Sequence, residues 1–418
     1  MKKLYSNALV WQEDTFVKLD ILIENGVIAA LEDRITSGYT DSVDWAGALI
    51  IPACIDMHVH VGEKTCGLEL SDNWQSLSRL AEKVGIAAIG AFITETGGSN
   101  KKQKTLIEQY KKTKVMAVHE FTRPVHWHLT PTVSEPQDII PLLMDDCDLK
   151  FYTTYKPSGL YKSYAELSRW MNDLQDLKPR MLVHCEDDDI VASKSAQTPF
   201  RHPFDHTLRR PEEAEVKAVE KVLDLAVQHN YPVHIVHVSV PKSSMLIREA
   251  QKSAPVTCET APHYLLLNEQ YLQKQNGHRW LCTPPLRSEA TRDLLVEMLP
   301  DGYFDVIATD HCPYMKSDKD KHQDNPEQVS MGIAGLGATL TLLYENFVKT
   351  GKLSWEKLIP MLTTNPAKLM HLYPKYGAIQ IGSQADLLLI KPDDGSVKKP
   401  VISSLSETYN PYQDFTHP

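Results

Sequence analysis

The sequence predicts an α/β fold, a (β/α)8 barrel flanked by a small β-domain. Short apolar stretches alternate with amphipathic stretches such as Pro211–His229 and Ser354–Met361, and this alternation is typical of buried parallel strands covered by helices. The number of apolar stretches matches the eight strands that close such a barrel. The stretches are Ile51–His60, Ala87–Glu95, Val125–Val133, Leu149–Tyr155, Met181–Glu186, Val233–Ser239, Val256–Ala261 and Phe304–Asp310.

The two ends of the chain predict the flanking domain. Residues 1–49 contain short alternating stretches such as Val17–Leu22 and Val27–Leu31, and the segment GAIQIGSQADLLLI near the C-terminus is strand-like again. We therefore expect residues 1–49 and 366–418 to form one composite β-domain, and residues 50–365 to form the barrel. The segments Gln197–Arg210 and Asp318–Gln328 are polar, so we expect both to be inserted loops and the second to be a mobile lid.

Composition limits the partners of the protein. The chain has 418 residues, 42% of them hydrophobic, and a net charge of −10. The basic runs Lys101–Lys104 and Lys111–Lys114 are predicted to lie on one solvated helix face, so no nucleic-acid partner is expected. No apolar stretch is long enough for a membrane span, and the seven scattered cysteines favour free thiols in the cytoplasm.

A histidine pair marks the end of the first predicted barrel strand. His58 and His60 are two residues apart, so on a strand their side chains point the same way. Histidine and aspartate also occur near the ends of later strands, where barrel enzymes place their active sites. The set predicts a site for zinc or a similar divalent ion, with Asp56 orienting one imidazole. Five other histidines are expected to have only hydrogen-bonded roles: His126, His128, His202, His206 and His234.

An ordered set of motifs carries a family resemblance. The motifs DMHVH, LKFYTTYK, VHCE, IVHVS, CETAPHY, CTPPLR, ATDHCP and GIAGLG follow one another along the chain, and TTNPAKL comes after them. Together they resemble the cyclic-amide group of the amidohydrolase superfamily, which contains dihydroorotases, hydantoinases, dihydropyrimidinases and allantoinases. The resemblance covers nearly the whole chain.

The resemblance implies two divalent metal ions, with zinc the first expectation, although the ligand types suit manganese and iron as well. It also implies a carboxylated lysine between the ions, because an unmodified ammonium has no lone pair to offer. Lys150 and Lys156 compete for this role, and the family pattern selects Lys150. The implied ligands are His58, His60 and Asp310 for one ion, His184 and His237 for the other, and Lys150 as the bridge.

The resemblance also implies a reaction. Water between two cations loses a proton near neutral pH and becomes a nucleophile. Asp310 would accept that proton and pass it to the leaving amide nitrogen, while Tyr155 would donate a hydrogen bond to the oxyanion. The expectation is a metal-dependent hydrolase that opens a small cyclic amide and forms homo-oligomers, either dimers or tetramers.

The substrate positions depart from the dihydroorotase pattern. Gly62 stands where dihydroorotases have an arginine that binds the substrate carboxylate, and Glu95 would repel that group. Thr283 replaces an asparagine and Tyr314 a histidine, so Thr283, Glu95 and Tyr314 are the predicted substrate-binding residues. Chain length and the DHCP motif still favour a dihydroorotase-like enzyme with an altered pocket.

Several alternatives stay open. Tyr155 and the missing arginine favour a hydantoinase or dihydropyrimidinase, and an allantoinase is a further possibility within the same group. A deaminase or deacetylase on the same barrel is disfavoured by the Lys150 segment. A non-catalytic dihydroorotase-like scaffold is disfavoured because every expected ligand position is filled.

Overall fold

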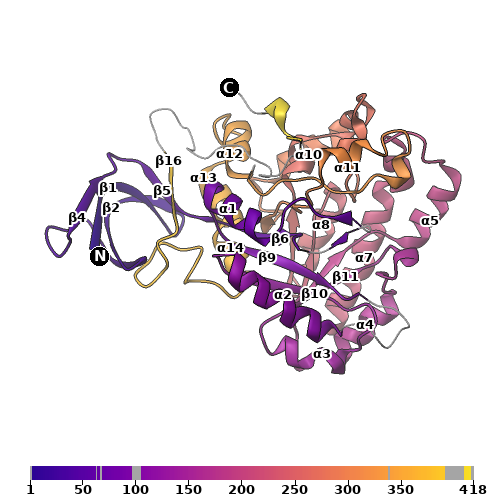
Figure 1. Cartoon of the computed structure of the whole chain (residues 1–418), viewed down its shortest axis with the longest axis horizontal. Coiled ribbons are helices and arrows are strands. Elements are labelled where there is room, and N and C mark those ends of the chain that lie inside the picture. The colour runs from indigo at the N-terminus through magenta and orange to yellow at the C-terminus, as the bar shows by residue number, and fades with distance from the viewer. Residues whose placement is uncertain are drawn as a thin grey trace.

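The barrel contains eight parallel strands, as predicted (Figure 1). The computed structural model describes residues 2–62, 64–65, 68–96, 105–337, 339–390 and 409–415. Neighbouring strands follow the order β15-β14-β13-β12-β11-β10-β9-β6, and a parallel bridge between Val59 and His311 closes the circle. The strands are β6 (Cys54–Val59), β9 (Ile86–Thr94), β10 (Val125–Thr130), β11 (Asp148–Tyr152), β12 (Met181–His184), β13 (Val233–Ile235), β14 (Val256–Thr260) and β15 (Val306–Ile307).

Helices surround the barrel, and their sequences contain ordinary start signals. Thr105 and Ser163 each accept a hydrogen bond from the backbone of a glutamate three residues later, which caps α2 and α4. Helix α7, which precedes β13, agrees closely with the predicted amphipathic stretch Pro211–His229, and Asn230 ends it in the left-handed conformation. The helices are α1 (Trp74–Val84), α2 (Leu106–Glu120), α3 (Pro136–Leu143), α4 (Tyr164–Asp173), α5 (Asp188–Gln197), α6 (Asp205–Arg209), α7 (Glu212–His229), α8 (Pro241–Ala250), α9 (Pro262–Leu266), α10 (Glu289–Met298), α11 (Lys316–Asp320), α12 (Thr339–Leu343), α13 (Trp355–Leu362) and α14 (Thr364–Leu369).

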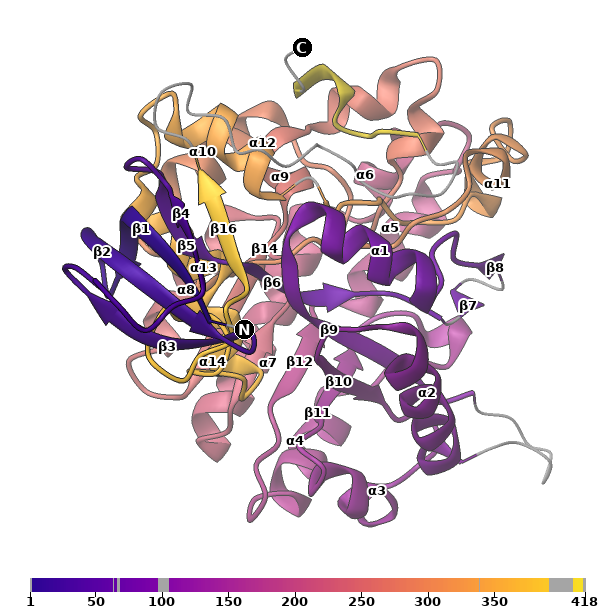
Figure 2. The same ribbon diagram turned by 60° about the vertical axis from the view of Figure 1, so that its left-hand side comes forward.

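A second sheet flanks the barrel and combines both ends of the chain (Figure 2). Its order is β16-β5-β1-β2-β3, with β4 paired to β1, and β16 runs antiparallel to β5. This sheet has a core of its own around Val10, Ile21 and Ile50. The composite sheet was expected, while the domain boundaries at 49/50 and 365/366 stay predictions. Its strands are β1 (Lys2–Gln12), β2 (Thr15–Glu24), β3 (Val27–Glu32), β4 (Asp41–Asp44), β5 (Leu49–Pro52) and β16 (Leu387–Ile390), and a separate two-stranded ribbon pairs β7 (Lys64–Thr65) with β8 (Leu68–Glu69).

The predicted strand Ile51–His60 is in fact two strands. Ala53 separates β5 from β6, and its backbone N–H donates to the carbonyl of Asp386. The apolar run therefore passes from the small sheet into the barrel without a turn signal. Several other barrel strands end earlier than predicted, because the chain turns away at residues with positive φ such as His237 and Asp310.

The two predicted loops contain short helices. Segment Gln197–Arg210 includes α6, and Asp318–Gln328 includes the end of α11 and a 3-10 turn at Pro326–Gln328. The prediction of a mobile lid is not supported, because the side chain of Lys319 is buried and its Nζ donates to three backbone carbonyls. This segment is therefore anchored to the barrel.

The end of the chain also differs from the prediction. Residues 409–415 pack against the barrel and not against the small sheet, since Trp280 donates its indole N–H to the carbonyl of Pro411 at 3.0 Å. Lys274 and Asp414 form an ion pair at 2.8 Å in the same region. Of the two basic runs, Lys111–Lys114 lies on α2 as expected, and Lys101–Lys104 lies outside the described residues.

Two predictions from composition can be compared with the structure. Within the described ranges, no helix combines the length and apolar character that a membrane crossing requires. The six cysteines in those ranges are buried free thiols, and Cys66 lies outside them.

Candidate metal centre and active site

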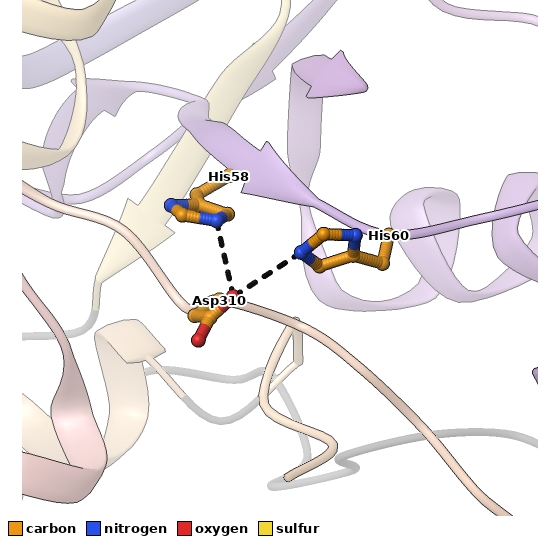
Figure 3. A group of neighbouring side chains, drawn as sticks. All are labelled: His58, His60 and Asp310. Carbon is orange, nitrogen blue, oxygen red and sulfur yellow. Dashed lines mark ion pairs between the residues drawn. The ribbon is translucent and has the colours of Figure 1, made fainter. Parts of the chain in front are cut away.

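The structure brings His58, His60 and Asp310 together at the carboxyl ends of β6 and β15 (Figure 3). Oδ1 of Asp310 lies 3.0 Å from Nε2 of His58 and 3.4 Å from Nε2 of His60. Burial disfavours ionisation of Asp310, but His58 and His60 outweigh it and hold the pKa of this carboxyl well below its usual range. Three ligand atoms that converge in this way are suited to one divalent ion.

Glu259 on β14 orients His58. The imidazole N–H at Nδ1 of His58 donates to Oε1 of Glu259, which leaves Nε2 directed toward Asp310. Metal-binding histidines commonly have such a carboxylate partner. Sequence reasoning assigned this role to Asp56, and that assignment is wrong. Asp56 instead accepts hydrogen bonds from the backbone N–H groups of His58 and Thr309 and from the Thr309 hydroxyl, so it joins the first strand to the last.

A second pair of imidazoles lies beside this trio. Nδ1 of His184 lies 2.9 Å from Nε2 of His237, and the rings of His58 and His237 are 5.5 Å apart. The other nitrogen of His184 donates to Oε2 of Glu186 at 2.9 Å. His184 therefore turns its lone pair toward His237, as two ligands of one cation would.

The chain turns sharply at His237. This residue has φ of 40°, so its side chain escapes the alternation of a regular strand. The buried Nδ1 of His237 has no hydrogen-bond partner among the described residues. His234 was expected to have only a hydrogen-bonded role, and its Nδ1 and Nε2 lie 2.8 and 3.2 Å from Thr257 and Glu259.

Lys150 points into the barrel between the two groups of ligands. Its Nζ is buried, has no hydrogen-bond partner in the described part of the chain, and lies 5.2 Å from the ring centres of Phe92 and Tyr152. Burial lowers its pKa to about 8, although Glu259 and Asp310 act in the opposite direction. The competing Lys156 is half exposed and pairs with Asp188 and Asp189.

These residues fit the metal centre that the family resemblance implies. The donor set combines imidazole nitrogens with a carboxylate, which suits zinc and its neighbours. An unpaired lysine amine is costly in such a buried place, and a carbamate held between two cations would remove that cost. The buried Nζ of Lys150, which has no hydrogen-bond partner among the described residues, therefore lies where a carbamate would meet bound ions.

A cavity of about 550 Å³ opens above the ligands. Tyr155 and Thr283 line it, as predicted for residues that meet substrate. Glu95 and Tyr314 do not line it, so the structure does not support their predicted substrate contacts. All the predicted metal ligands line the cavity: His58, His60, Lys150, His184, His237 and Asp310.

Glu95 has a different role. Its carboxylate accepts hydrogen bonds from the backbone N–H groups of Thr132, Val133 and Ser134 and from the Ser134 hydroxyl. Burial raises the pKa of Glu95, but these hydrogen bonds outweigh it and the net shift is downward. Glu95 therefore fixes the loop after β10, and its neighbour Thr94 lines the cavity instead.

Sequence reasoning missed the residues that position Tyr155. The guanidinium of Arg210 lies 4.8 Å from the centre of the Tyr155 ring and forms an ion pair with Glu186. Burial opposes ionisation of Glu186, but Arg210 and His184 lower its pKa to about 2. Glu186 thus contacts the predicted metal ligand His184 and, through Arg210, is connected to the predicted catalytic residue Tyr155. In the sequence, only its place in the VHCE motif pointed to Glu186.

The backbone conformation and a neighbouring indole ring both favour glycine at position 62. Gly62 has φ of +67°, and a Cβ at this position would lie 2.6 Å from Nε1 of Trp74. A larger side chain would therefore be strained by the backbone conformation and would require Trp74 to move. Gly62 is not among the residues that line the cavity.

The arginines that line the cavity are engaged elsewhere. Arg210 pairs with Glu186, and Arg209 donates to the carbonyls of Ser195 and Thr198 at 3.4 and 2.7 Å. Of the remaining histidines, His206 contacts Thr283 at 3.1 Å, while His202 accepts a hydrogen bond from the backbone of Phe204.

Comparisons with known proteins agree with this arrangement. Residues 49–413 match the amidohydrolase family. The D-phenylhydantoinase of Escherichia coli O81 (strain ED1a) is 28% identical over all of this chain and 91% of its own. The dihydropyrimidinase of Brevibacillus agri NCHU1002 superimposes with a TM-score of 0.86 at 25% identity, covering 93% of this chain and 86% of that one. A D-hydantoinase from a Bacillus species gives a TM-score of 0.85 at 24% identity with the same coverage, which supports the fold.

These relatives agree better with the hydantoinase alternative than with the dihydroorotase-like expectation. The match to the family begins at the first residue of β5 and ends at the start of the last described turn, and it includes every predicted metal ligand. The chain belongs to the amidohydrolase family, within the cyclic-amide group of that superfamily.

Proposed function

We propose that this protein is a metal-dependent hydrolase that opens a hydantoin or dihydropyrimidine ring at an amide C–N bond. The names of its relatives support this class of substrate. The observation that carries the choice within the class concerns the arginine side chains that line the cavity. These are Arg209 and Arg210, and both are already engaged by other groups of the protein.

The metal ligands divide into two sets. His58, His60 and Asp310 would hold one divalent ion, His184 and His237 the other, and Lys150 would bridge them after carboxylation. When bound, two such ions lower the pKa of a water between them and polarise the carbonyl that is attacked. The proposal of a carboxylated Lys150 is supported by its buried, unpartnered Nζ, and zinc is proposed from the ligand types.

Asp310 is the proposed proton carrier. Its carboxylate is ionised at neutral pH and lies at the cavity wall between the two histidines of the trio. An ionised carboxylate in this position can accept a proton from the attacking water and then release it to the ring nitrogen as the C–N bond breaks. Glu259 keeps the neighbouring imidazole of His58 in a fixed orientation during both transfers.

Tyr155 is the proposed donor to the oxyanion. It lines the cavity, its backbone has φ of 74°, and its ring packs on Arg210. A phenol held in this way can donate to the oxygen on which negative charge develops. Thr283 lines the same cavity and is the proposed contact to a polar ring atom of the substrate.

A substrate panel tests the proposal. Protein loaded with zinc in bicarbonate would be given phenylhydantoin, dihydrouracil, allantoin and dihydroorotate, and ring-opened product would be quantified by chromatography. We expect kcat/KM for phenylhydantoin or dihydrouracil to exceed that for dihydroorotate by about 100-fold, since Arg209 and Arg210, which line the cavity, already bind other groups of the protein. A preference for dihydroorotate would overturn the assignment.

Matched variants separate chemistry from folding. Asp310→Asn should lower kcat by at least about 100-fold, because an amide cannot carry the proton. Asp301→Asn makes the same change at an exposed position and should leave kcat unchanged. Absence of turnover on every cyclic amide, in protein that retains its metal, would favour the scaffold alternative. The oligomeric state stays a prediction that light scattering would check.

A further inference from the structure

A second cluster of metal-ligand side chains lies inside the barrel, below the site described above. His126 and His128 belong to β10 and Asp148 begins β11, with His128 and Asp148 directly paired in the strand register. Trp127 lies between the two histidines in sequence and packs outward against Trp74 on α1, so both imidazoles face the barrel interior. Barrel interiors are normally filled by branched apolar side chains, which makes this polar layer unusual.

The three ligand atoms have the spacing of a coordination site. Oδ2 of Asp148 lies 3.0 Å from Nε2 of His126 and 3.9 Å from Nδ1 of His128, and all three atoms lie within 4.8 Å of one another. Ligands bonded to a tetrahedral zinc ion at about 2.0–2.1 Å are about 3.4 Å apart. All three residues are at most 5% exposed.

His128 presents a lone pair to this space. Its Nε2 donates to the carbonyl of Met57 at 3.0 Å, so the lone pair of the neutral ring is on Nδ1. That buried nitrogen has no hydrogen-bond partner in the described part of the chain, and the carboxylate beside it also carries lone pairs. Two acceptors facing each other in the interior are unfavourable, and a cation between them would satisfy both. A backbone carbonyl that holds the opposite nitrogen is the usual companion of a metal-binding histidine.

Gly90 makes the orientation of His128 possible. The ring of His128 reaches across β9, which lies between β10 and β6, to contact Met57. A Cβ at Gly90 would lie 2.5 Å from Nε2 of His128 and would also collide with the Met57 carbonyl. The imidazole therefore occupies a place that only glycine leaves open.

The carboxylate oxygens of Asp148 already accept hydrogen bonds. The backbone N–H of Arg180 donates to Oδ1 at 3.1 Å, and Nη1 of Arg180 lies 3.5 Å from Oδ2 while also donating to the carbonyl of Leu369. The backbone contact satisfies Oδ1, whereas Oδ2 accepts from Arg180 at 3.5 Å and lies 3.0 Å from Nε2 of His126, which can donate to it when no ion is bound. When the proton of His126 is on Nδ1 instead, Nε2 and Oδ2 both present lone pairs to the same space, as ligands of one ion would.

We propose that His126 Nε2, His128 Nδ1 and Asp148 Oδ2 form a structural zinc site, separate from the catalytic ions. None of these three residues lines the substrate cavity. Phe92 lies between the two places, with its ring 5.0 Å from that of His128 and 4.6 Å from those of His58 and His60. The ion would join β10 to β11 and, through the Met57 contact, hold β6 in register beneath the catalytic pair.

Anomalous diffraction tests the site directly. Crystals of the wild-type protein equilibrated with zinc chloride would be measured on both sides of the zinc absorption edge. We expect a peak about 2 Å from each of the three ligand atoms, in addition to density at His58 and His60. A map in which the second position has no peak at saturating zinc overturns the proposal, whatever the first position shows.

Variants give an independent readout in solution. Elemental analysis after dialysis should find one zinc fewer per chain in His128→Gln than in wild type. Added zinc should also raise the Tm of His128→Gln by less than it raises the Tm of wild type. His278→Gln is the matched control, because His278 is also buried and paired with an aspartate, Asp320, at 2.8 Å, but belongs to no three-ligand cluster. Equal zinc content in wild type and His128→Gln would also refute the site.

Discussion

Replacing Lys319 by methionine should change how the stability of the protein depends on pH. Lys319 lies on α11, and its buried Nζ donates to the carbonyls of Arg279, Leu281 and Gly332 at 2.9, 3.1 and 2.6 Å. These contacts fasten the segment after β15, which includes cavity-lining residues, to the chain before it. Burial lowers the pKa of Lys319 from 10.5 to about 7.

The direction of the change in unfolding free energy with pH follows from which state of the chain binds the proton. Between pH 7 and about 10.5 the unfolded chain binds a proton at Lys319 that the folded chain has released. The neutral amine that remains in the folded chain has two N–H donors, so in this window it donates to two of the three carbonyls. The free energy of unfolding therefore rises with pH across this window, by about 1 kcal/mol per unit and about 2 kcal/mol between pH 7.5 and 9. Lys319→Met removes this contribution and flattens the dependence by the same amount.

The substitution should also lower stability near pH 7. Leu281 keeps a donor in the backbone N–H of Gly332, and Arg279 keeps the hydroxyl of Tyr409, but the carbonyl of Gly332 loses its Lys319 donor. A buried carbonyl without a partner costs about 1–3 kcal/mol.

Urea unfolding followed by tryptophan fluorescence at pH 7.5 and 9 measures both effects. Lys316→Met, at an exposed position of the same helix, is the control and should follow wild type. Parallel pH dependence in wild type and Lys319→Met would refute the reasoning. It would mean that the three carbonyls keep the ammonium charged in spite of burial.

Three further predictions concern the site. Gly62→Ala should lower stability by about 2 kcal/mol, because a left-handed backbone and a nearby indole both oppose a Cβ; an unchanged urea midpoint would contradict this. Glu186→Gln should weaken zinc binding through His184 by about 10-fold or more in a competition titration, and unchanged affinity would show that the contact is dispensable. Lys150→Ala should reduce bound zinc below wild type in elemental analysis, whereas Lys156→Ala should not; the reverse result would move the bridging role to Lys156.

The parts of the fold that could be predicted from sequence are those set by local patterns. Alternation of apolar runs with amphipathic segments is enough to count eight strands, and a period of two places His58 and His60 on one face. Prediction failed where the chain changes course without a local signal. Ala53 interrupts a continuous apolar run because the two halves belong to different sheets, and only the three-dimensional structure shows where they part.

The candidate site shows the same division. Residues that would bind metal lie at strand ends and can be found one strand at a time. Residues that orient the side chains of the site can come from distant parts of the chain, as Glu259 on β14 does for His58 and Arg210 at the end of α6 does for Tyr155. Asp56 illustrates the error, because proximity in sequence suggested an imidazole partner, whereas its carboxylate spans the barrel seam to Thr309. Pairing across the barrel depends on closure, which no local pattern encodes.

Two glycines, Gly62 and Gly90, have structural roles that sequence patterns do not predict. Sequence comparison singled out Gly62 for the arginine that it replaces, but it gave no sign of the packing at Gly62 or Gly90. At Gly62 a Cβ would meet the indole of Trp74, and at Gly90 the missing Cβ leaves room for the imidazole of His128. A glycine gives no sequence pattern that shows why a Cβ is missing. The reason becomes visible only in the structure, from the atoms that lie where the Cβ would be. The proposed second metal site therefore depends on packing around Gly90, while the proposed ligands of the first site depend on strand periodicity.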